Sequence, residues 1–328
     1  LDDDRLARAH VLAGRYAVRG LRGQGAMTQV LLGEDVRSGE PVVIKVLDAG
    51  FSSLPGVAER FAREAEALGR ISHPHVVRSL AAGIASDGLP FHVLEHLAGE
   101  GLDEWLRREP RPPVALGLRL LVQTASGLEA VHRAGIVHRD VKPANVMVLG
   151  DHDAPRVAKV VDLGFARVEG ASSLTPPGTA LGTLAYMAPE QLVSDAVDAR
   201  TDVYALAVVA FRMFSGRLPF EGDGLDLMAR QLAEPCPSLD SLVPDADPRL
   251  VRVLRAALSK NPARRHPTMA ALRDDLARCT TPDTRSLLVA DSLASGPVDV
   301  FVPGPGMPRQ AACFLLRRLG RPVPEWGD

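Results

Sequence analysis

The run of residues 138–145, HRDVKPAN, constrains this chain more than any other feature of its sequence. Asp140, Lys142 and Asn145 lie within it, and Asp162 follows in the tripeptide DLG. Together these residue types supply a candidate base, a cation that suits a phosphate group and two candidate metal ligands. Phosphoryl transfer asks a protein chiefly to position a nucleotide and to neutralise charge with metal ions and cations. The run therefore indicates chemistry on a phosphoryl group.

Lysine is rare in this chain, which draws attention to the lysines that remain. Of the 38 lysines and arginines, only four are lysines. Two of them, Lys45 and Lys142, lie in candidate motifs. A compact ammonium group fits a tight phosphate pocket in which a planar guanidinium has the wrong shape. Codon bias toward arginine explains why lysine is rare, but not where it is retained.

With this spacing, the chain resembles the eukaryotic-like (Hanks-type) bacterial serine/threonine protein kinases over roughly residues 16–279. Residues 138–145 match the catalytic-loop pattern HRDxKPxN, and DLG matches DFG with leucine in the middle. An HRD tripeptide alone would more often be a solvated turn. The resemblance implies that Asp140 accepts the proton of the substrate hydroxyl and that Lys142 contacts the transferred phosphate. It also implies that Asn145 and Asp162 bind magnesium.

A glycine-rich segment, GQGAMT, begins at Gly23 and leads into two predicted strands over residues 30–32 and 41–45. Gly23 and Gly25 allow the backbone to approach a phosphate closely. Thr28 replaces the third glycine of the family pattern, and it would be strained if that position required a positive φ angle. A plain hairpin is the alternative interpretation of this segment.

Lys45 ends the second of these strands. A lysine at a strand end often serves solubility alone, but the apolar residues before it and the glycine segment favour a role at the α- and β-phosphates. Residues 57–71 show the apolar spacing of a helix, and the resemblance implies that Glu64 on this helix pairs with Lys45. Val43 stands where the family usually has a small residue, which narrows the space for an adenine ring.

Residues 91–94 are typical of a further strand and residues 95–97 of a hinge, where the resemblance implies that adenine binds backbone groups. The other implied nucleotide contacts come from the glycine segment and the strands around it. The implied cofactor-binding residues are Gly23, Gly25, Val30, Val43, Lys45, Leu94, Glu95, Leu97 and Met147.

Residues 183–190, TLAYMAPE, match the end of a kinase activation segment and imply a protein substrate. The resemblance assigns Thr183 a role in supporting the catalytic aspartate and lysine. It also pairs Glu190 with Arg265 in a buried ion pair. Alternatively, Glu190 could be a solvated glutamate at the start of a helix.

Two further residues receive structural roles from the resemblance. Asp202 would accept hydrogen bonds from the backbone of the catalytic loop, although an aspartate there could also cap a helix by itself. His138 would brace the loop rather than take part in the chemistry.

Four hydroxyl residues before Thr183 form a candidate regulatory switch, namely Ser172, Ser173, Thr175 and Thr179. A phosphate on one of them would add a charge of about −1.5 to −2 and could pair with Arg139. The alternative is that these hydroxyls are only solvated, as most loop hydroxyls are.

Composition limits the other partners and the compartment. The net charge is −2 and the pI is near 6.6, so a broad basic face for nucleic acid is not expected. Cys236, Cys279 and Cys313 lack metal-ligand spacing and indicate a reducing, cytoplasmic compartment. The longest apolar run, 203–214, is shorter than the about 20 residues that span a bilayer. No membrane segment is expected within this chain, and an anchor elsewhere in a longer protein is left open.

The sequence predicts four regions. Within the third, residues 114–134 and 200–215 are predicted helices, the second apolar nearly all round. Autoinhibition by the last region is a further hypothesis. The regions are an N-terminal extension (1–15), a kinase N-lobe with its hinge (16–97), a kinase C-lobe (98–279) and a proline-rich tail (280–328).

The resemblance, together with these features, implies an α+β, two-lobed protein kinase fold, with a small antiparallel β-sheet N-lobe that carries one key helix and a larger, mainly α-helical C-lobe. The predicted activity is transfer of the γ-phosphate of ATP, with Mg²⁺ or Mn²⁺, to a serine or threonine of a protein substrate. Self-association for trans-autophosphorylation is left open.

Two alternatives to this activity are open. One is a nucleotide-binding pseudokinase that acts as a scaffold or allosteric module, suggested by Thr28, Val43 and the proline-rich tail. The other is a small-molecule phosphotransferase of the same fold, which the match over residues 183–190 disfavours.

Overall fold

The computed structural model describes residues 11–25, 27–150, 156–162, 183–193 and 197–279. Within these ranges the chain forms two compact units. We call residues 11–70 and 78–96 the sheet unit, and residues 71–77 and 97–279 the helical unit.

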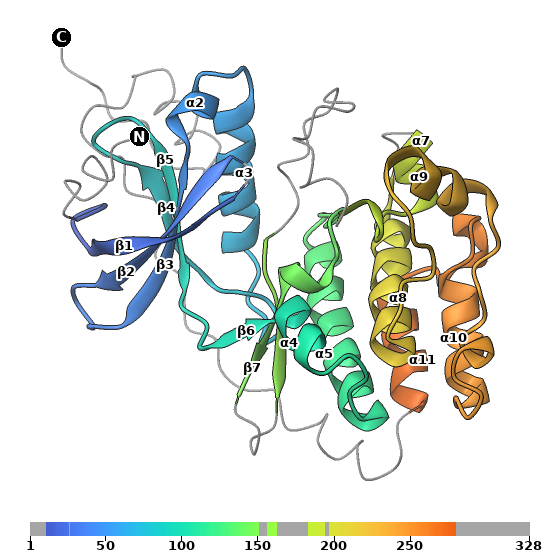
Figure 1. Ribbon diagram of the computed structural model, residues 1–328. Helices are drawn as coiled ribbons and strands as arrows, with labels where there is room; N and C mark the ends of the chain where they lie inside the picture. The colour runs from blue at the N-terminus through green and yellow to red at the C-terminus, as the bar shows by residue number, and fades with distance from the viewer. Residues whose placement is uncertain (1–10, 26, 151–155, 163–182, 194–196, 280–328) are drawn as a thin grey trace. The chain divides into compact units, whose positions relative to one another are not determined.

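The sheet unit is built on a five-stranded antiparallel sheet with the strand order β1-β2-β3-β5-β4 (Figure 1). Hairpins join β1 to β2 and β2 to β3, so these pairings are local in sequence. Gly39 turns the chain between β2 and β3 with a φ angle of 74°. The strands are β1 (Tyr16–Gln24), β2 (Thr28–Asp35), β3 (Pro41–Leu47), β4 (Ser79–Ile84) and β5 (Pro90–Glu95).

Alternation along β3 gives this sheet two different faces. Val42, Ile44 and Val46 are buried in the core of the sheet unit, whereas Val43 and Lys45 between them are half-buried on the opposite face.

The chain packs onto this core before β1 begins. Leu12 is buried in the core and forms a β-bridge with Tyr16. Residues 11–15, which the sequence analysis set apart as an extension, therefore pack with the sheet unit.

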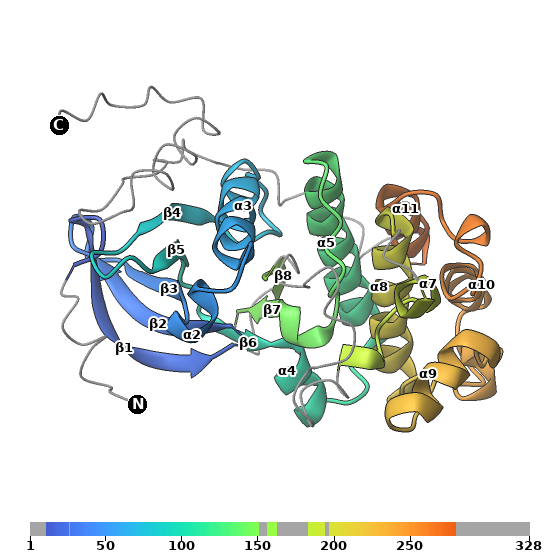
Figure 2. The same cartoon turned by 90° about the horizontal axis from the view of Figure 1, so that it is seen from above.

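Two helices follow β3, namely α2 (Ala49–Ser52) and α3 (Val57–Gly69). α3 confirms the helix predicted over residues 57–71. Its buried residues Val57, Ala65 and Leu68 form one stripe. α3 packs against β4 and β5 (Figure 2).

The helical unit combines a three-stranded antiparallel sheet, in the order β6-β7-β8, with packed helices. The strands are β6 (Gly99–Gly101), β7 (Val146–Leu149) and β8 (Val157–Val160). The helices are α4 (Leu102–Arg108), α5 (Val114–Arg133), α7 (Pro189–Val193), α8 (Ala199–Ser215), α9 (Gly224–Ala233), α10 (Pro248–Ala257) and α11 (Met269–Arg278). The short 3₁₀ turns are η1 (Pro143–Asn145), η2 (Leu239–Ser241) and η3 (Pro262–Arg264).

Residues 71–77 lie with the helical unit, although the sequence analysis placed them in the N-lobe. Main-chain hydrogen bonds tie this segment to β8. The N–H of Val160 donates to the carbonyl of His75 at 2.9 Å, and the N–H of Val77 donates to the carbonyl of Val160 at 2.9 Å. Gly127 of α5 permits the approach, because a Cβ atom there would lie 2.3 Å from the carbonyl oxygen of His75.

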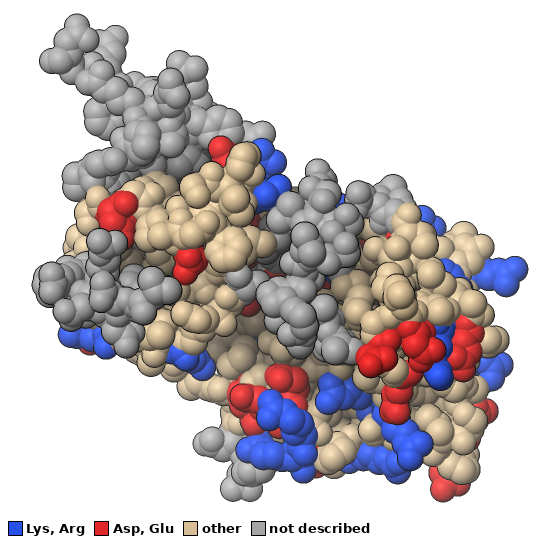
Figure 3. Space-filling view, turned by 45° about the horizontal axis from the view of Figure 1, so that its top comes forward, with Lys and Arg blue, Asp and Glu red and all other residues tan. Residues whose placement is uncertain are grey.

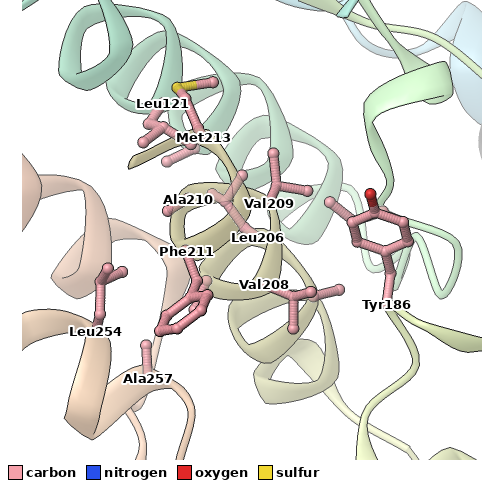
Figure 4. Packing of buried hydrophobic residues seen from close by; sticks show 14 of the residues in the cluster. Leu121, Tyr186, Leu206, Val208, Val209, Ala210, Phe211, Met213, Leu254 and Ala257 are labelled. Carbon is pink, nitrogen blue, oxygen red and sulfur yellow. The ribbon is translucent and has the colours of Figure 1, made fainter. Parts of the chain in front are cut away.

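α8 forms the centre of the helical unit and confirms the helix predicted over residues 200–215. Nearly all of its residues are buried, which explains why its sequence is apolar on every side. Figure 4 shows side chains of this core from three helices, with Leu121 of α5, Phe211 of α8 and Leu254 of α10 among them.

Among the described helices, α5 alone is long and apolar enough to cross a membrane by length and composition. Its apolar window has a mean hydropathy of 1.3 and is 61% buried inside the protein. α5 packs against α8, α11 and β8. Burial within the helical unit therefore accounts for its apolar character.

Charged side chains of both signs lie interspersed on the face drawn in Figure 3. This distribution agrees with the net charge of −2.

Candidate active site

The catalytic loop of the helical unit is held by a buried carboxylate of α8. Asp202 is 0% exposed and accepts the backbone N–H groups of His138 and Arg139, each at 2.8 Å. His132, at the end of α5, contacts the same carboxylate through Nε2 at 2.7 Å. The predicted role of Asp202 in holding the loop is confirmed.

The alternative role of Asp202 as a helix cap is wrong. The N-cap of α8 is Asp198, whose side chain accepts the backbone N–H of Arg200 at 2.8 Å. Asp202 lies in the first turn of the helix instead, where a carboxylate also interacts favourably with the helix dipole.

Within this loop, two side chains converge on the candidate base. Lys142 donates from Nζ to Oδ2 of Asp140 at 2.8 Å and to the hydroxyl of Thr183 at 3.1 Å. Asn145 donates from Nδ2 to the carbonyl of Asp140 at 2.8 Å and to its Oδ2 at 3.0 Å. The side chains of Asp140 and Lys142 remain 23% and 22% exposed, so a substrate group can reach them.

His138 is buried and braces the loop from inside, as predicted. Its Nδ1 accepts the N–H of Asp140 at 3.3 Å, so its other nitrogen, Nε2, carries the hydrogen that faces the carbonyl of Val161 at 3.4 Å. The ring is therefore engaged on both sides. It joins the catalytic loop to the residue before Asp162.

Asp162 follows β8 with a φ angle of 56°. A non-glycine residue in this region is unfavourable and is typical of functional sites. The N–H of Val161 donates to the carbonyl of Asn145 at 3.0 Å, so the chain that carries Asp162 runs beside the chain that carries Asn145.

The two predicted metal ligands suit a hard divalent cation. Magnesium takes oxygen ligands, often from only one or two protein groups together with phosphates and water. The Nδ2 of Asn145 is committed to Asp140, which leaves its Oδ1 as the amide atom able to bind a cation. Across the part of the chain that the structure describes, no group of three or more His, Cys, Asp or Glu could form a metal cage made of protein alone. An amide oxygen and a carboxylate therefore fit an ion that arrives with a nucleotide.

Glu190 and Arg265 form the buried ion pair that the sequence predicted. The guanidinium donates to both carboxylate oxygens at 2.7 Å, and the Arg265 side chain is 0% exposed. Thr201 donates to Oε1 of Glu190 at 2.9 Å. Burial raises the pKa of Glu190, but the hydrogen bonds and the charge of Arg265 lower it by a larger amount. The pKa of Glu190 therefore lies below its ordinary value.

Gln191 is a structural residue of this site that the sequence analysis missed. Its Nε2 donates to the carbonyl of Arg139 at 2.9 Å, and its Oε1 accepts the N–H of Ala188 at 3.0 Å. One side chain thereby joins the end of the 183–190 segment to the catalytic loop. Only its position directly after Glu190 could have drawn attention to it.

In the sheet unit, the strand register gathers four predicted nucleotide residues on one face. Val30 of β2 lies opposite Lys45 of β3, and Val43 of β3 lies opposite Leu94 of β5. Val43 and Lys45 are two residues apart and point to the same side. This face is the one turned away from the core of the sheet unit.

The glycine segment forms the hairpin between β1 and β2. Gly23 pairs with Val30, and the N–H of Gly25 donates to the carbonyl of Thr28 at 2.7 Å. Thr28 begins β2 and is not among the described residues with positive φ, so the strain considered for this replacement is absent. A hairpin can present N–H groups to a phosphate, so the role of this segment at the phosphates stays a prediction.

Of the remaining predicted residues, three lie on α3, β5 and β7, and Leu97 lies in the segment before β6. Glu64 is half-buried on α3. Glu95 is held by Arg78, whose N–H donates to its Oε1 at 2.8 Å and whose carbonyl accepts its N–H at 3.0 Å. In the helical unit, Leu97 is buried and Met147 is half-buried on β7. The ion pair between Lys45 and Glu64 stays a prediction.

The candidate switch residues Ser172, Ser173, Thr175 and Thr179 lie outside the described residues, as do Cys313 and the proline-rich tail.

Comparison with known proteins places this arrangement among characterised families. Residues 16–276 match the family described as protein kinase domain. The chain is 34% identical over 325 residues to the serine/threonine-protein kinase pkn3 of Myxococcus xanthus, covering 97% of this chain and 59% of that protein. It is 36% identical over 269 residues to the serine/threonine-protein kinase PknL of Mycobacterium bovis, covering 81% of this chain and 66% of that protein.

A solved structure shows the same fold. The kinase domain of Mycobacterium tuberculosis PknI matches with a TM-score of 0.64 and 28% identity, covering 82% of this chain and 98% of that chain. The chain spans between 35% and 66% of the length of the curated relatives it matches.

Proposed function

Because this chain belongs to the protein kinase domain family, we propose that it transfers the γ-phosphoryl group of ATP to a serine or threonine hydroxyl of a protein. The observation that carries the proposal is the convergence of Lys142 and Asn145 on the carboxylate of Asp140. The names of the curated relatives, bacterial serine/threonine kinases, support the choice of residue that is phosphorylated.

In this proposal Asp140 orients the substrate hydroxyl and accepts its proton as the oxygen attacks the γ-phosphorus. The bond from that phosphorus to the bridging oxygen of ADP breaks, and ADP leaves. Lys142 balances negative charge beside it, and Thr183 holds the ammonium group in place through the hydrogen bond at 3.1 Å. Asn145 and Asp162 would hold the divalent cation. When bound, magnesium or manganese would neutralise charge on the nucleotide phosphates.

We assign the nucleotide contacts in two sets. In the sheet unit, the glycine hairpin would face the phosphates with its N–H groups, and Lys45, positioned by Glu64, would bind the α- and β-phosphates. Val30, Val43 and Leu94 would contact the adenine from their shared face. The backbone of Glu95 and, in the helical unit, Leu97 and Met147 would complete the adenine contacts.

The test is transfer of radiolabel from γ-labelled ATP with Mg²⁺ to a generic protein substrate. We expect Asp140→Asn to lower the rate at least about 100-fold, since a positioned base typically contributes 10²–10⁴. Asp240→Asn, at an exposed acid of η2, is the matched control and should retain the wild-type rate. Equal label transfer by wild type and Asp140→Asn would leave the pseudokinase alternative.

We also propose that two copies associate for trans-autophosphorylation. α9 exposes Leu225 (82%), Ala229 and Leu232 (40%), which are spaced to form one apolar stripe. α7 packs against α9 and exposes Val193 (69%). If this stripe is the interface, Leu225→Asp should remove the concentration dependence of autophosphorylation and leave phosphorylation of an added substrate unchanged. Persistence of that dependence in Leu225→Asp would contradict the assignment.

Phosphorylation of Ser172, Ser173, Thr175 or Thr179 is proposed as the means of activation, and mass spectrometry after incubation with ATP and Mg²⁺ tests it.

The free thiols of Cys236 and Cys279, together with the need for ATP, support a cytoplasmic location.

A further inference from the structure

The carbonyl of Leu184 is held by a buried side chain of α9. Gln231 is 0% exposed and donates from Nε2 to this carbonyl at 2.7 Å. Leu184 directly follows Thr183, whose hydroxyl accepts from Lys142, and Lys142 donates to Asp140. α9 is therefore connected, through one side-chain amide, to the stretch of chain beside the candidate base.

The orientation of this amide is determined by its partner. A carbonyl can only accept, so Gln231 must present Nε2 to Leu184 and direct Oε1 elsewhere. Within the described residues, Oε1 is buried and has no hydrogen-bond partner. A buried acceptor without a donor is unfavourable. An apolar side chain of similar length would avoid that cost but would lose the bond to Leu184.

The end of α9 that carries Gln231 is itself anchored. Lys260 donates from Nζ to the backbone carbonyl of Gln231 and, at 3.4 Å, to that of Arg230. The same nitrogen lies 3.9 Å from the centre of the Phe220 ring. A cation at this position stabilises the carboxyl end of a helix. Gln231 therefore extends from a rigid support toward the 183–190 segment.

We infer that Gln231 is a positioning residue for the protein substrate, an inference that rests on the proposed kinase function. A polypeptide whose hydroxyl reaches Asp140 must lie against the residues joined to Thr183. By holding the carbonyl of Leu184, Gln231 sets the path of those residues. It touches neither the nucleotide groups nor the reacting atoms, so its effect falls on binding of the polypeptide and not on use of ATP.

The experiment measures kcat, the KM for a protein substrate, the KM for ATP and the midpoint of thermal unfolding. For Gln231→Met we expect the KM for the protein substrate to rise about fivefold, the effect of losing one ordinary hydrogen bond. The KM for ATP and kcat should stay within about twofold of wild type. Because the variant also removes an unsatisfied buried acceptor, the unfolding midpoint should be unchanged or higher. Ala233→Met, at an exposed position of α9, is the matched control and should change none of these quantities.

A second variant guards against an unforeseen folding defect in the first. Gln231→Leu also introduces an apolar side chain of similar bulk and also removes the donor to Leu184, without burying a charge, so the KM for the protein substrate should rise by a similar factor. A wild-type KM for the protein substrate in both variants would overturn the inference. The inference would also be overturned if both variants lowered kcat and left both KM values unchanged. It would be overturned as well if the KM for the protein substrate rose only in a variant with a lower unfolding midpoint.

The two proposals can fail separately. If wild type and Asp140→Asn transfer label equally, the proposed function fails. If wild type is an active kinase and Gln231→Met behaves as wild type, only the assignment of Gln231 fails.

Discussion

The carboxylate of Asp202 accepts the backbone N–H of Arg139 at 2.8 Å, at a point where Arg139 has a φ angle of 64°. A non-glycine residue in the left-handed region costs about 1–2 kcal/mol. A carboxylate of α8 thus holds Arg139 in a strained backbone conformation. Asp140 comes directly after Arg139, so the direction of the candidate base depends on a bond made by another element.

Replacing Asp202 with alanine should both destabilise the helical unit and inactivate the protein. Three groups would lose their acceptor, namely the N–H groups of His138 and Arg139 and the ring of His132. Removing one partner of a buried charged network typically costs about 3–5 kcal/mol. Urea unfolding measures the loss of stability, and label transfer at a temperature where the variant stays folded measures the loss of activity.

Asp198→Ala is the control for this change, because Asp198 lies in the same stretch of chain and caps α8. Losing the cap should cost about 1 kcal/mol and leave activity unchanged. If Asp202→Ala behaved like Asp198→Ala in both measurements, the loop would be held by something other than this carboxylate.

Replacing Arg265 with lysine should destabilise the protein although the charge is kept. The guanidinium makes two parallel bonds to Glu190 and also donates to the carbonyls of Arg200, Ser259 and Lys260. An ammonium group cannot reproduce this fork. We expect a loss of about 2–4 kcal/mol in the free energy of unfolding, measured by denaturant titration.

A double-mutant cycle separates the ion pair from the other contacts of Arg265. If the pair with Glu190 matters, Arg265→Lys combined with Glu190→Gln should cost less than the sum of the single changes. Strict additivity would show that the backbone carbonyls, and not Glu190, account for the effect.

Stability should fall as the pH is lowered from about 6.5 toward 4. Burial and the charges of His75 and Arg133 lower the pKa of His73 to about 4, from an ordinary value of 6.5. Between these values the unfolded chain binds a proton that the folded chain does not, so acid favours unfolding. Glu190 continues the trend at lower pH, because its lowered pKa contributes stability that is lost as the pH falls below its ordinary value of 4.5.

The thermal unfolding midpoint between pH 7.5 and pH 4.5 measures this effect. His73→Asn keeps an acceptor for the N–H of His75, which Nδ1 of His73 accepts at 3.2 Å, but it cannot titrate. The variant should show a shallower decline than wild type. An identical decline in both proteins would assign the acid sensitivity to other groups.

Replacing Gly25 with alanine should weaken ATP binding through a collision within the hairpin. A Cβ atom at this position would lie 2.8 Å from the hydroxyl oxygen of Thr28. We expect the KM for ATP to rise about threefold to tenfold, equivalent to roughly 1 kcal/mol of strain. Gly20→Ala on β1 is the control, because no atom lies within 4 Å of its added Cβ.

In this explanation, collision with the hydroxyl of Thr28 causes the rise in the KM for ATP. Adding Thr28→Ala to Gly25→Ala should therefore restore the KM for ATP to near the wild-type value. If the double variant is no better than Gly25→Ala, the glycine is needed for another reason, such as close approach of a phosphate.

Several features were predictable because they depend on neighbouring residues or on spacing along the chain. The apolar spacing of residues 57–71, 114–134 and 200–215 predicted α3, α5 and α8. The pairing of Glu190 with Arg265 followed from the resemblance to a family. The roles of Gln191 and Gln231 did not, because each depends on a backbone carbonyl that carries no signal in the sequence.

The place of residues 71–77 within the helical unit also escaped prediction. Residues 71–77 follow α3 in the chain but pair with β8, and nothing local in their sequence reveals that partner.

The sequence by itself determined the kinds of groups available: an aspartate, a lysine and an amide in one short run, and a second aspartate after a strand. These groups can be read from the sequence because residue type sets the chemistry of a side chain, and the spacing of the residues is visible in their linear order. Tertiary structure alone decided how those groups are held. The hydrogen bonds that Asp202 accepts and the one that Gln191 donates join residues far apart in the chain, and only packing of the core around α8 brings their atoms within bonding distance.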